Sequence, residues 1–261
     1  MIMKKIFNIA IVCMALVFAS CEQNGPSWKN GIGAFSVAPD KQVAFSPGNL
    51  EYNENTFEWC FSENSLDGIS FDRWEAGWID EFVWDDFVDD KFVDWGMYTI
   101  GKDSPYTWRS LTKEELEFLL FKRANADKLF GVAAVYEEDS DWDCRGLILL
   151  PDNWECPNGI AFVPGVSDGS SVGSEGYAHH QMLTIEEWSK MEKKGAVFLR
   201  TNTFDSDGWF DGTYSGYYFL STIDKEEHGH PYTLYFDHET MPKISGFYGG
   251  GDGSVRLVKD L

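Results

Sequence analysis

Three aspartates in one glycine-rich loop have side chains that could bind a hard cation. Asp205, Asp207 and Asp211 lie within residues 205–212, and two of them are followed directly by glycine. Calcium is bound by carboxylate and carbonyl oxygens of flexible loops, so this pattern is compatible with a calcium site. The loop lacks the distal glutamate of an EF-hand, and Asp-Gly pairs also form ordinary turns. A calcium site and a plain polar turn are therefore both open.

A second group of possible metal ligands contains His228 and His230, with Glu226, Glu227 and His238 nearby. Imidazoles at alternating positions of an extended segment could share a metal with a carboxylate. The segment is rich in glycine, proline and charge, and no HExxH spacing is present. We therefore favour a solvated hairpin loop.

Residues 72–95 alternate large aromatic side chains with acids. Trp78 and Trp84, with Asp85 and Asp86, could form a concave site in which aromatic faces stack on sugar rings and carboxylates accept hydroxyl hydrogens. The alternative, which we favour, is that the aromatic side chains point inward and the acids outward, because exposed aromatics would form an apolar patch that usually needs a partner. The aromatic residues are Trp74, Trp78, Phe82, Trp84, Phe87, Phe92 and Trp95, and the other acids include Asp80, Glu81, Asp89, Asp90 and Asp94.

The charge of the chain limits its partners. The sequence has 43 Asp and Glu residues against 21 Lys and Arg residues, a formal net charge of −22. A field of this sign repels phosphate backbones, so nucleic-acid binding is disfavoured. A hydrolase with paired carboxylates remains an alternative. It requires two carboxyl groups at a defined separation, and among so many acids the sequence does not identify such a pair.

The cysteines allow one disulfide in an oxidising compartment. Three of the five cysteines are candidates, because Cys13 lies in an expected export signal and Cys21 is the expected lipidation site, as described next. Cys144 and Cys156 flank the apolar run 146–150, and a bond between them would leave Cys60 over. Three buried, reduced thiols are the alternative, because a free cysteine packs as a small hydrophobic residue.

The first twenty residues have the anatomy of an export signal. Lys4 and Lys5 precede the apolar run 6–18, which is shorter than the roughly twenty residues that a membrane span needs. Residues 17–21, which read VFASC, resemble the lipobox of bacterial lipoproteins, and this resemblance implies cleavage before Cys21 and lipidation of its thiol. We expect several acyl chains to hold the protein at the outer membrane, on the cell surface or the periplasmic face.

The remaining chain is expected to form a tether and one domain. Residues 21–33 predict the tether and residues 34–261 a single domain. Thr112 and Thr184 each precede a glutamate by three residues, the capping box of a helix start. Two short helices among many strands predict an α+β fold. The expected strands are 34–37, 42–45, 56–61, 146–150, 196–199, 217–222, 232–236 and 254–258, each bounded by turn-forming residues.

Four of these segments together resemble one family. Residues 108–116 (WRSLTKEEL), 146–154 (GLILLPDNW), 216–222 (GYYFLST) and 253–258 (GSVRLV) are similar, in this order, to motifs of the Fibrobacter succinogenes major paralogous domain, found in Bacteroidetes lipoproteins. The resemblance covers residues 34–261 and implies the C-type lectin-like fold of formylglycine-generating enzymes. We expect Trp108, Trp154 and Trp188 to fill the space between its layers.

The resemblance also indicates what the domain does not do. Formylglycine-generating enzymes need a cysteine pair near the end of the domain, and this chain has no cysteine after Cys156. We therefore predict a non-catalytic binding or adhesion module for a glycan, peptide or protein. A carbohydrate-active hydrolase and a structural subunit of a surface assembly are the alternatives.

Overall fold

The computed structural model describes residues 32–66, 68–84, 93–139, 143–165, 181–201, 215–225, 229–237, 242–246 and 252–261. Strands dominate, with a few short helices between them, so the predicted α+β class is confirmed. Among the described residues, no helix is both long and apolar enough to cross a membrane.

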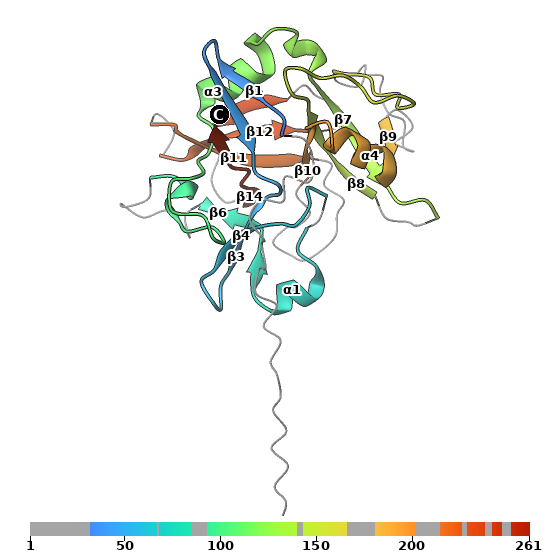
Figure 1. Cartoon of the computed structure of the whole chain (residues 1–261). Coiled ribbons are helices and arrows are strands. Elements are labelled where there is room, and N and C mark those ends of the chain that lie inside the picture. Colours follow the sequence, from blue (N-terminus) through green and yellow to red (C-terminus); the bar gives the residue numbers. More distant parts are fainter. Residues whose placement is uncertain are drawn as a thin grey trace, which may run out of the picture.

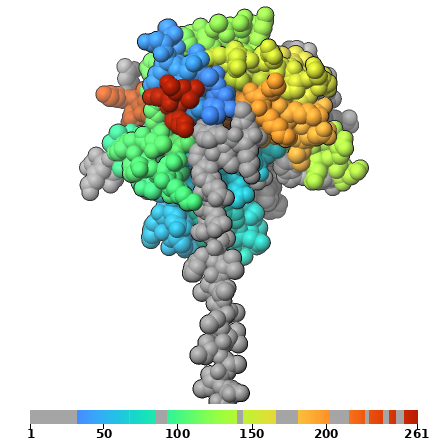
Figure 2. Space-filling view, viewed as in Figure 1, coloured from blue at the N-terminus to red at the C-terminus, as the bar shows by residue number. Residues whose placement is uncertain are grey.

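The two ends of the described chain lie in one sheet. β1 (Phe35–Ala38) and β2 (Lys41–Phe45) form an antiparallel hairpin, and β15 (Val258–Asp260) pairs antiparallel with the other edge of β2. The Phe35 and Phe45 rings meet edge to face, with their centroids 4.9 Å apart. The last residues (red) accordingly lie against the first strands (blue) in Figure 2.

A four-stranded sheet carries the longer helix. Its order is β10 (Val197–Arg200), β8 (Asp143–Leu149), β7 (Phe130–Tyr136) and β9 (Gln181–Thr184), with β9 parallel to β7 and the other pairs antiparallel. Helix α4 (Ile185–Glu192) follows β9 directly and packs against this sheet (Figure 1). It buries Trp188 and Met191 in the same hydrophobic cluster as Phe198 of β10.

Two further sheets complete the body. The five-stranded sheet has the order β13 (Lys243–Gly246), β12 (Pro231–Phe236), β11 (Gly216–Ile223), β14 (Asp252–Ser254) and β6 (Glu81–Val83). The three-stranded sheet has the order β4 (Trp59–Phe61), β3 (Leu50–Asn53) and β5 (Trp78–Ile79). In the sequence, helix α1 (Phe71–Glu75) precedes β5, and the 3-10 turn η1 (Trp95–Met97) follows β6.

Both predicted capping boxes are confirmed. The Thr112 hydroxyl accepts from the backbone N–H of Glu115 at 3.2 Å, and the Glu115 carboxylate accepts from the Thr112 N–H at 3.0 Å. Helix α3 (Lys113–Glu117) starts there and continues through the wider turn η2 (Phe118–Lys122) to the short η3 (Ala126–Lys128). The same exchange between Thr184 and Glu187 starts α4.

The predicted strand 254–258 is wrong, because the chain changes sheets there. β14 ends at Ser254 and β15 begins at Val258. Between them, the carbonyls of Val255 and Leu257 accept from the backbone N–H groups of Leu50 and Ser46, each at 2.8 Å. The strands β3, β5, β6, β7, β9 and β13 were not predicted, whereas β1, β2, β4, β8, β10, β11 and β12 overlap the predicted segments.

Most described aromatic residues of 72–95 are buried, as the favoured interpretation predicts. Phe82, Trp84 and Trp95 join Trp108 and Phe219 in one cluster. Trp108 and Trp188 are fully buried, and Trp154 is partly buried against the cluster around α4. The exception is Trp74 of α1, whose side chain is exposed.

Candidate functional site

Several predicted site residues lie outside the described residues. These are the lipidation site Cys21, the acids Asp85 and Asp86, the calcium candidates Asp205, Asp207 and Asp211, and the histidines His228 and His238. Within the part of the chain that the structure describes, no group of three or more His, Cys, Asp or Glu side chains could hold a metal ion.

Trp78 and Trp84 do not form a sugar-stacking surface. Trp78 is 7% exposed, and the Arg73 guanidinium lies 4.6 Å from its ring centroid. Trp84 is 4% exposed and packs against Trp95 and Phe219. A sugar ring needs an open aromatic face, so the proposed ligand role of these two tryptophans does not fit their burial.

None of the three described cysteines forms a disulfide with another described residue. Cys144 is buried and donates to the carbonyl of Leu66 at 3.4 Å, whereas Cys156 is exposed. Cys60 is buried and donates to the Glu51 carboxylate at 3.4 Å. The disulfide alternative for Cys144 and Cys156 is thus absent from this structure, and the all-buried alternative holds for two of the three thiols.

Some acids of the aromatic segment point inward rather than outward. Asp80 follows β5, is 4% exposed and forms an ion pair with Arg200 at the end of β10. Glu81 lies 3.7 Å from the same guanidinium nitrogen. Burial alone would lower the pKa of Arg200, but the two carboxylates outweigh it and raise the pKa. This pair joins two sheets and is structural.

A chain of buried polar groups extends from this pair. The Tyr218 hydroxyl donates to the Arg200 carbonyl at 3.0 Å and accepts from the Asn49 amide at 3.3 Å. The Asn49 oxygen accepts from Arg256 at 3.4 Å. Burial raises the pKa of Tyr218 to about 12 and lowers that of Arg256 to about 10. The charge of Arg256 in turn acts on Glu192 of α4, at the surface hollow described next.

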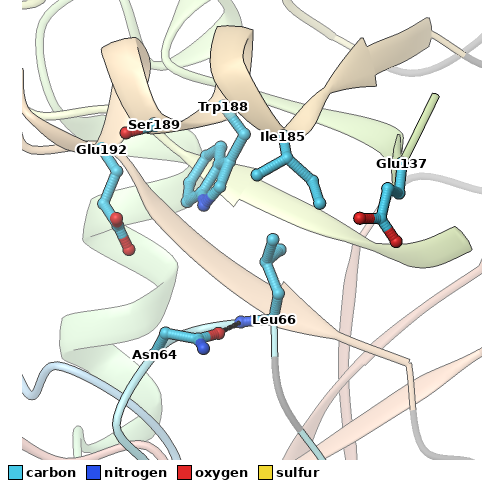
Figure 3. Close-up of a pocket in the computed structure, with 7 residues that line it drawn as sticks. All are labelled: Asn64, Leu66, Glu137, Ile185, Trp188, Ser189 and Glu192. Atoms are coloured by element: carbon cyan, nitrogen blue, oxygen red, sulfur yellow. Dashed lines mark hydrogen bonds between the residues drawn. The ribbon is translucent and has the colours of Figure 1, made fainter.

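A hollow of about 420 Å³ lies between α4, the end of β7 and the segment 64–66 (Figure 3). We call it the α4 trough. Leu66, Ile185 and Trp188 form its apolar middle, and the carboxylates of Glu192 and Glu137 lie at opposite ends in Figure 3. Asn64 and Ser189 complete the lining.

Trp188 brings an unused hydrogen-bond donor to the α4 trough. The side chain is 2% exposed, and its ring packs edge to face on Phe198 with centroids 5.4 Å apart. Its indole N–H has no hydrogen-bond partner among the described residues, and in Figure 3 the nitrogen faces the space between Glu192 and Leu66. A donor on a buried ring that meets no protein acceptor is expected to bond water or a ligand.

The other polar groups of the trough are held in place by short contacts. Glu192 accepts from the Ser65 hydroxyl at 3.1 Å, and burial raises the pKa of its carboxyl group. The Asn64 side-chain oxygen accepts from the backbone N–H of Leu66 at 2.9 Å, which fixes the turn that carries Leu66. Glu137 is exposed and forms no ion pair with the residues that the structure describes.

The sequence alone identified only part of this site. Trp188 was predicted as core packing, which is correct for its ring but not for its N–H group. Glu137 and Glu192 were not singled out, because nothing in their spacing distinguishes them from other acids. The capping box at Thr184 was the one available signal, since it predicts that Ile185, Trp188 and Glu192 follow on one short helix.

A second surface feature lies on α1. Phe71 is 69% exposed and Trp74 is 57% exposed, and their ring centroids lie 6.0 Å apart. The acids Asp72 and Glu75 belong to the same helix. Two open aromatic faces beside carboxylates resemble the stacking surface that the sequence suggested for Trp78 and Trp84.

Comparison with protein-family models, with curated proteins and with solved structures found no match to this chain.

Proposed function

We propose that this protein is an exported, lipid-anchored binding module of the outer membrane, with a C-type lectin-like fold and a ligand site in the α4 trough. The ligand is a glycan, a peptide or a segment of another protein. The anchor is Cys21, and the acidic body keeps the module away from nucleic acids and anionic lipid.

The fold assignment is supported by the elements that the four motif segments form. The segment 108–116 leads into α3, and 146–154 begins inside β8. The segment 216–222 lies in β11, and 253–258 connects β14 with β15. The helix entry at 108–116 and the strand at 216–222 agree with the resemblance, whereas 253–258 joins two strands instead of forming one. The lack of a cysteine after Cys156 supports a module without the oxidase activity.

The indole N–H of Trp188, which has no acceptor among the residues that the structure describes, is the observation that carries the binding proposal. The ring is 2% exposed, yet its nitrogen faces the trough. Because this N–H opens to the trough, a carbonyl or hydroxyl oxygen of a ligand can take the place of water as its acceptor. Apolar walls with a few converging polar groups are typical of small-ligand sites.

The test uses the full chain in detergent micelles against a glycan array and a peptide array. Trp188→Phe keeps an aromatic ring and removes the N–H, so we expect binding of the captured ligand to weaken about fivefold, as for one lost hydrogen bond. Ile185→Asn changes the apolar middle at a position that is 41% exposed and should also weaken binding.

The matched control is Trp154→Phe, which makes the same exchange in a side chain packed against the same hydrophobic cluster. It should leave binding unchanged. Blank arrays with folded wild-type protein, or equal binding by the Trp188→Phe and Trp154→Phe variants, would contradict the proposal.

The exposed pair on α1 favours a second candidate function, stacking of a sugar ring on Trp74 and Phe71. Aromatic pairs this exposed usually meet a partner. Trp74→Ala should then abolish capture on the glycan array without affecting a ligand that depends on Trp188. Retention of all glycan capture by Trp74→Ala would exclude this surface.

A further inference from the structure

The α4 trough has a definite order of chemical groups along its length. Figure 3 shows the Trp188 nitrogen, Asn64 and Glu192 toward one end, Leu66 and Ile185 in the middle, and Glu137 at the other end. A ligand that fits this order has hydrogen-bonding groups at one end, an unbranched apolar stem and a cation at the far end.

From this order we propose that the trough binds a lysine or arginine side chain of an extended polypeptide. The inference rests on the proposed function, because it names the ligand class of the same site. In this arrangement a backbone carbonyl of the ligand accepts from the Trp188 N–H. The aliphatic stem of the basic side chain lies on Leu66 and Ile185, and its charged group reaches Glu137.

The charges of the site favour a cation. Glu137 is an exposed carboxylate at the rim, and no described side chain forms an ion pair with it. The whole chain carries a net charge of −22, which raises the local concentration of basic ligands and repels acidic ones. Glu192, at the opposite end, already lies in the field of Arg256 and has a hydrogen bond from Ser65. Glu137 is therefore the better position for a second cation.

The apolar middle favours an aliphatic stem over a sugar ring. Ile185 is 41% exposed and Leu66 is half-buried, so both present branched apolar surface to the trough. Lysine and arginine bury their methylene groups on such surfaces while the charged end stays in water. A neutral sugar has neither a long stem nor a cation for Glu137.

The Trp188 donor separates a polypeptide from a free amine. Because an indole N–H only donates, its partner must be an acceptor. A protonated diamine has a stem and two cations but no acceptor, whereas each peptide unit supplies one carbonyl. The site should therefore prefer a lysine residue within a peptide over a diamine of similar length.

The experiment measures binding of four probes to the full chain in detergent micelles by isothermal titration calorimetry. The probes are capped pentapeptides Gly-Gly-X-Gly-Gly with lysine, norleucine or glutamate as X, and pentane-1,5-diamine. We expect the lysine peptide to bind about threefold tighter than the norleucine peptide, as for one exposed ion pair, and tighter than the glutamate peptide and the diamine. The preference for lysine should weaken with added salt.

Variants of Glu137 test whether the preference for the lysine peptide arises in the α4 trough. Glu137→Gln should make the lysine and norleucine peptides bind equally, and Glu137→Lys should favour the glutamate peptide. Glu138→Gln is the matched control, since Glu138 is the next exposed acid and does not line the trough. It should leave the preference for lysine unchanged.

The outcomes separate this inference from the proposed function. Equal binding of the lysine and norleucine peptides, both weakened by Trp188→Phe, would overturn the basic side chain and leave the binding site standing. Glycan capture that depends on Trp188, without binding of any peptide, would do the same. A diamine that binds as tightly as the lysine peptide would overturn the polypeptide. Failure of both arrays and all four probes would overturn both proposals.

Discussion

Asp80 is an inward-pointing acid of the aromatic segment, and it forms a buried ion pair with Arg200. Both side chains are about 6% exposed, and 120 positions separate them in the chain. Removing two charges from water is unfavourable, and only their direct contact offsets it. Such a pair is sensitive to the loss of one partner, which makes it a sharp test of the structure.

Asp80→Asn should destabilise the protein by about 3 kcal/mol, because it removes the carboxylate in direct contact with buried Arg200 and leaves the more distant Glu81, 3.7 Å away, to balance its charge. The free energy of unfolding in urea measures this change. Glu117→Gln removes an exposed pair with Lys122, whose nitrogen is 2.8 Å from the carboxylate, and should change stability by less than about 0.5 kcal/mol. Similar effects of the two variants would mean that Arg200 is not buried as described.

Glu115 should make the stability of the fold depend on pH in the acidic range. Burial alone would raise the pKa of Glu115, but hydrogen bonds from Arg109 and Lys41 outweigh it and lower the pKa below 4.5. A lowered pKa means that ionised Glu115 stabilises the fold above pH 4.5, and that this contribution disappears as the pH falls through the lower, folded value.

Glu115→Gln should therefore lower stability at neutral pH by roughly 1 kcal/mol and flatten its decline below pH 4.5. Urea midpoints measured from about pH 7 down to about pH 3 test this. The control is Glu114→Gln, an exposed acid in the same helical turn. Parallel pH curves for the wild type and Glu115→Gln would contradict the prediction.

At the scale of elements, two helices begin by the same exchange of hydrogen bonds but support different surfaces. α3 packs against β1 and β11, whereas α4 packs against β9 and β7 and presents the trough residues.

Close packing restricts the residue type at one position of the four-stranded sheet that carries α4. A Cβ at Gly146 of β8 would lie 2.3 Å from the Leu199 carbonyl oxygen, so only glycine fits there.

Thr112→Ala and Thr184→Ala should each lower the free energy of unfolding by about 1 kcal/mol, since each leaves a helix N-terminus without its cap. Serine at either position should restore most of the stability. Only Thr184→Ala should also weaken the ligand that depends on Trp188, because it frays the first turns of α4. If both alanine variants weakened binding equally, the ligand would not be bound at the α4 trough.

In the molecule as a whole, the first and last described strands belong to one sheet. β1 begins at Phe35, shortly after the predicted tether 21–33, and β15 closes the same three-stranded sheet (Figure 1). The sheet formed by the ends of the described chain is thus the part of the body nearest in sequence to the proposed anchor. The trough lies beside a different, four-stranded sheet.

Cys21→Ser should move the protein from the membrane fraction to the soluble fraction without changing its unfolding midpoint, since the lipid would be lost and the body would remain intact. Fractionation and mass spectrometry of the N-terminal peptide measure both effects. Cys156→Ser, a change at an exposed free thiol, is the control and should stay in the membrane fraction. An unmodified thiol at residue 21 in the wild type would refute the anchor.

Much of the local structure could be predicted from the sequence. The capping boxes at Thr112 and Thr184 are exchanges within four residues, so the residues that form them identify them. Most turn-bounded apolar runs are strands, since this pattern too is set by residues close together in the chain. β3 was missed because it contains the buried polar residues Glu51 and Asn53, and β7 because Gly131, Ala133 and Ala134 weaken its strand pattern.

What only the tertiary structure decided depends on groups that are far apart in the chain. Asp80 is indistinguishable from its acidic neighbours until Arg200 is placed beside it. The hydrophobic character of Trp188 predicts its burial but not that its N–H meets no acceptor in the part of the chain that the structure describes. The trough needs segment 64–66, the end of β7 and α4 together. Local hydrogen bonds are set by nearby residues, whereas a cavity and the donor that faces it are created only when distant elements pack.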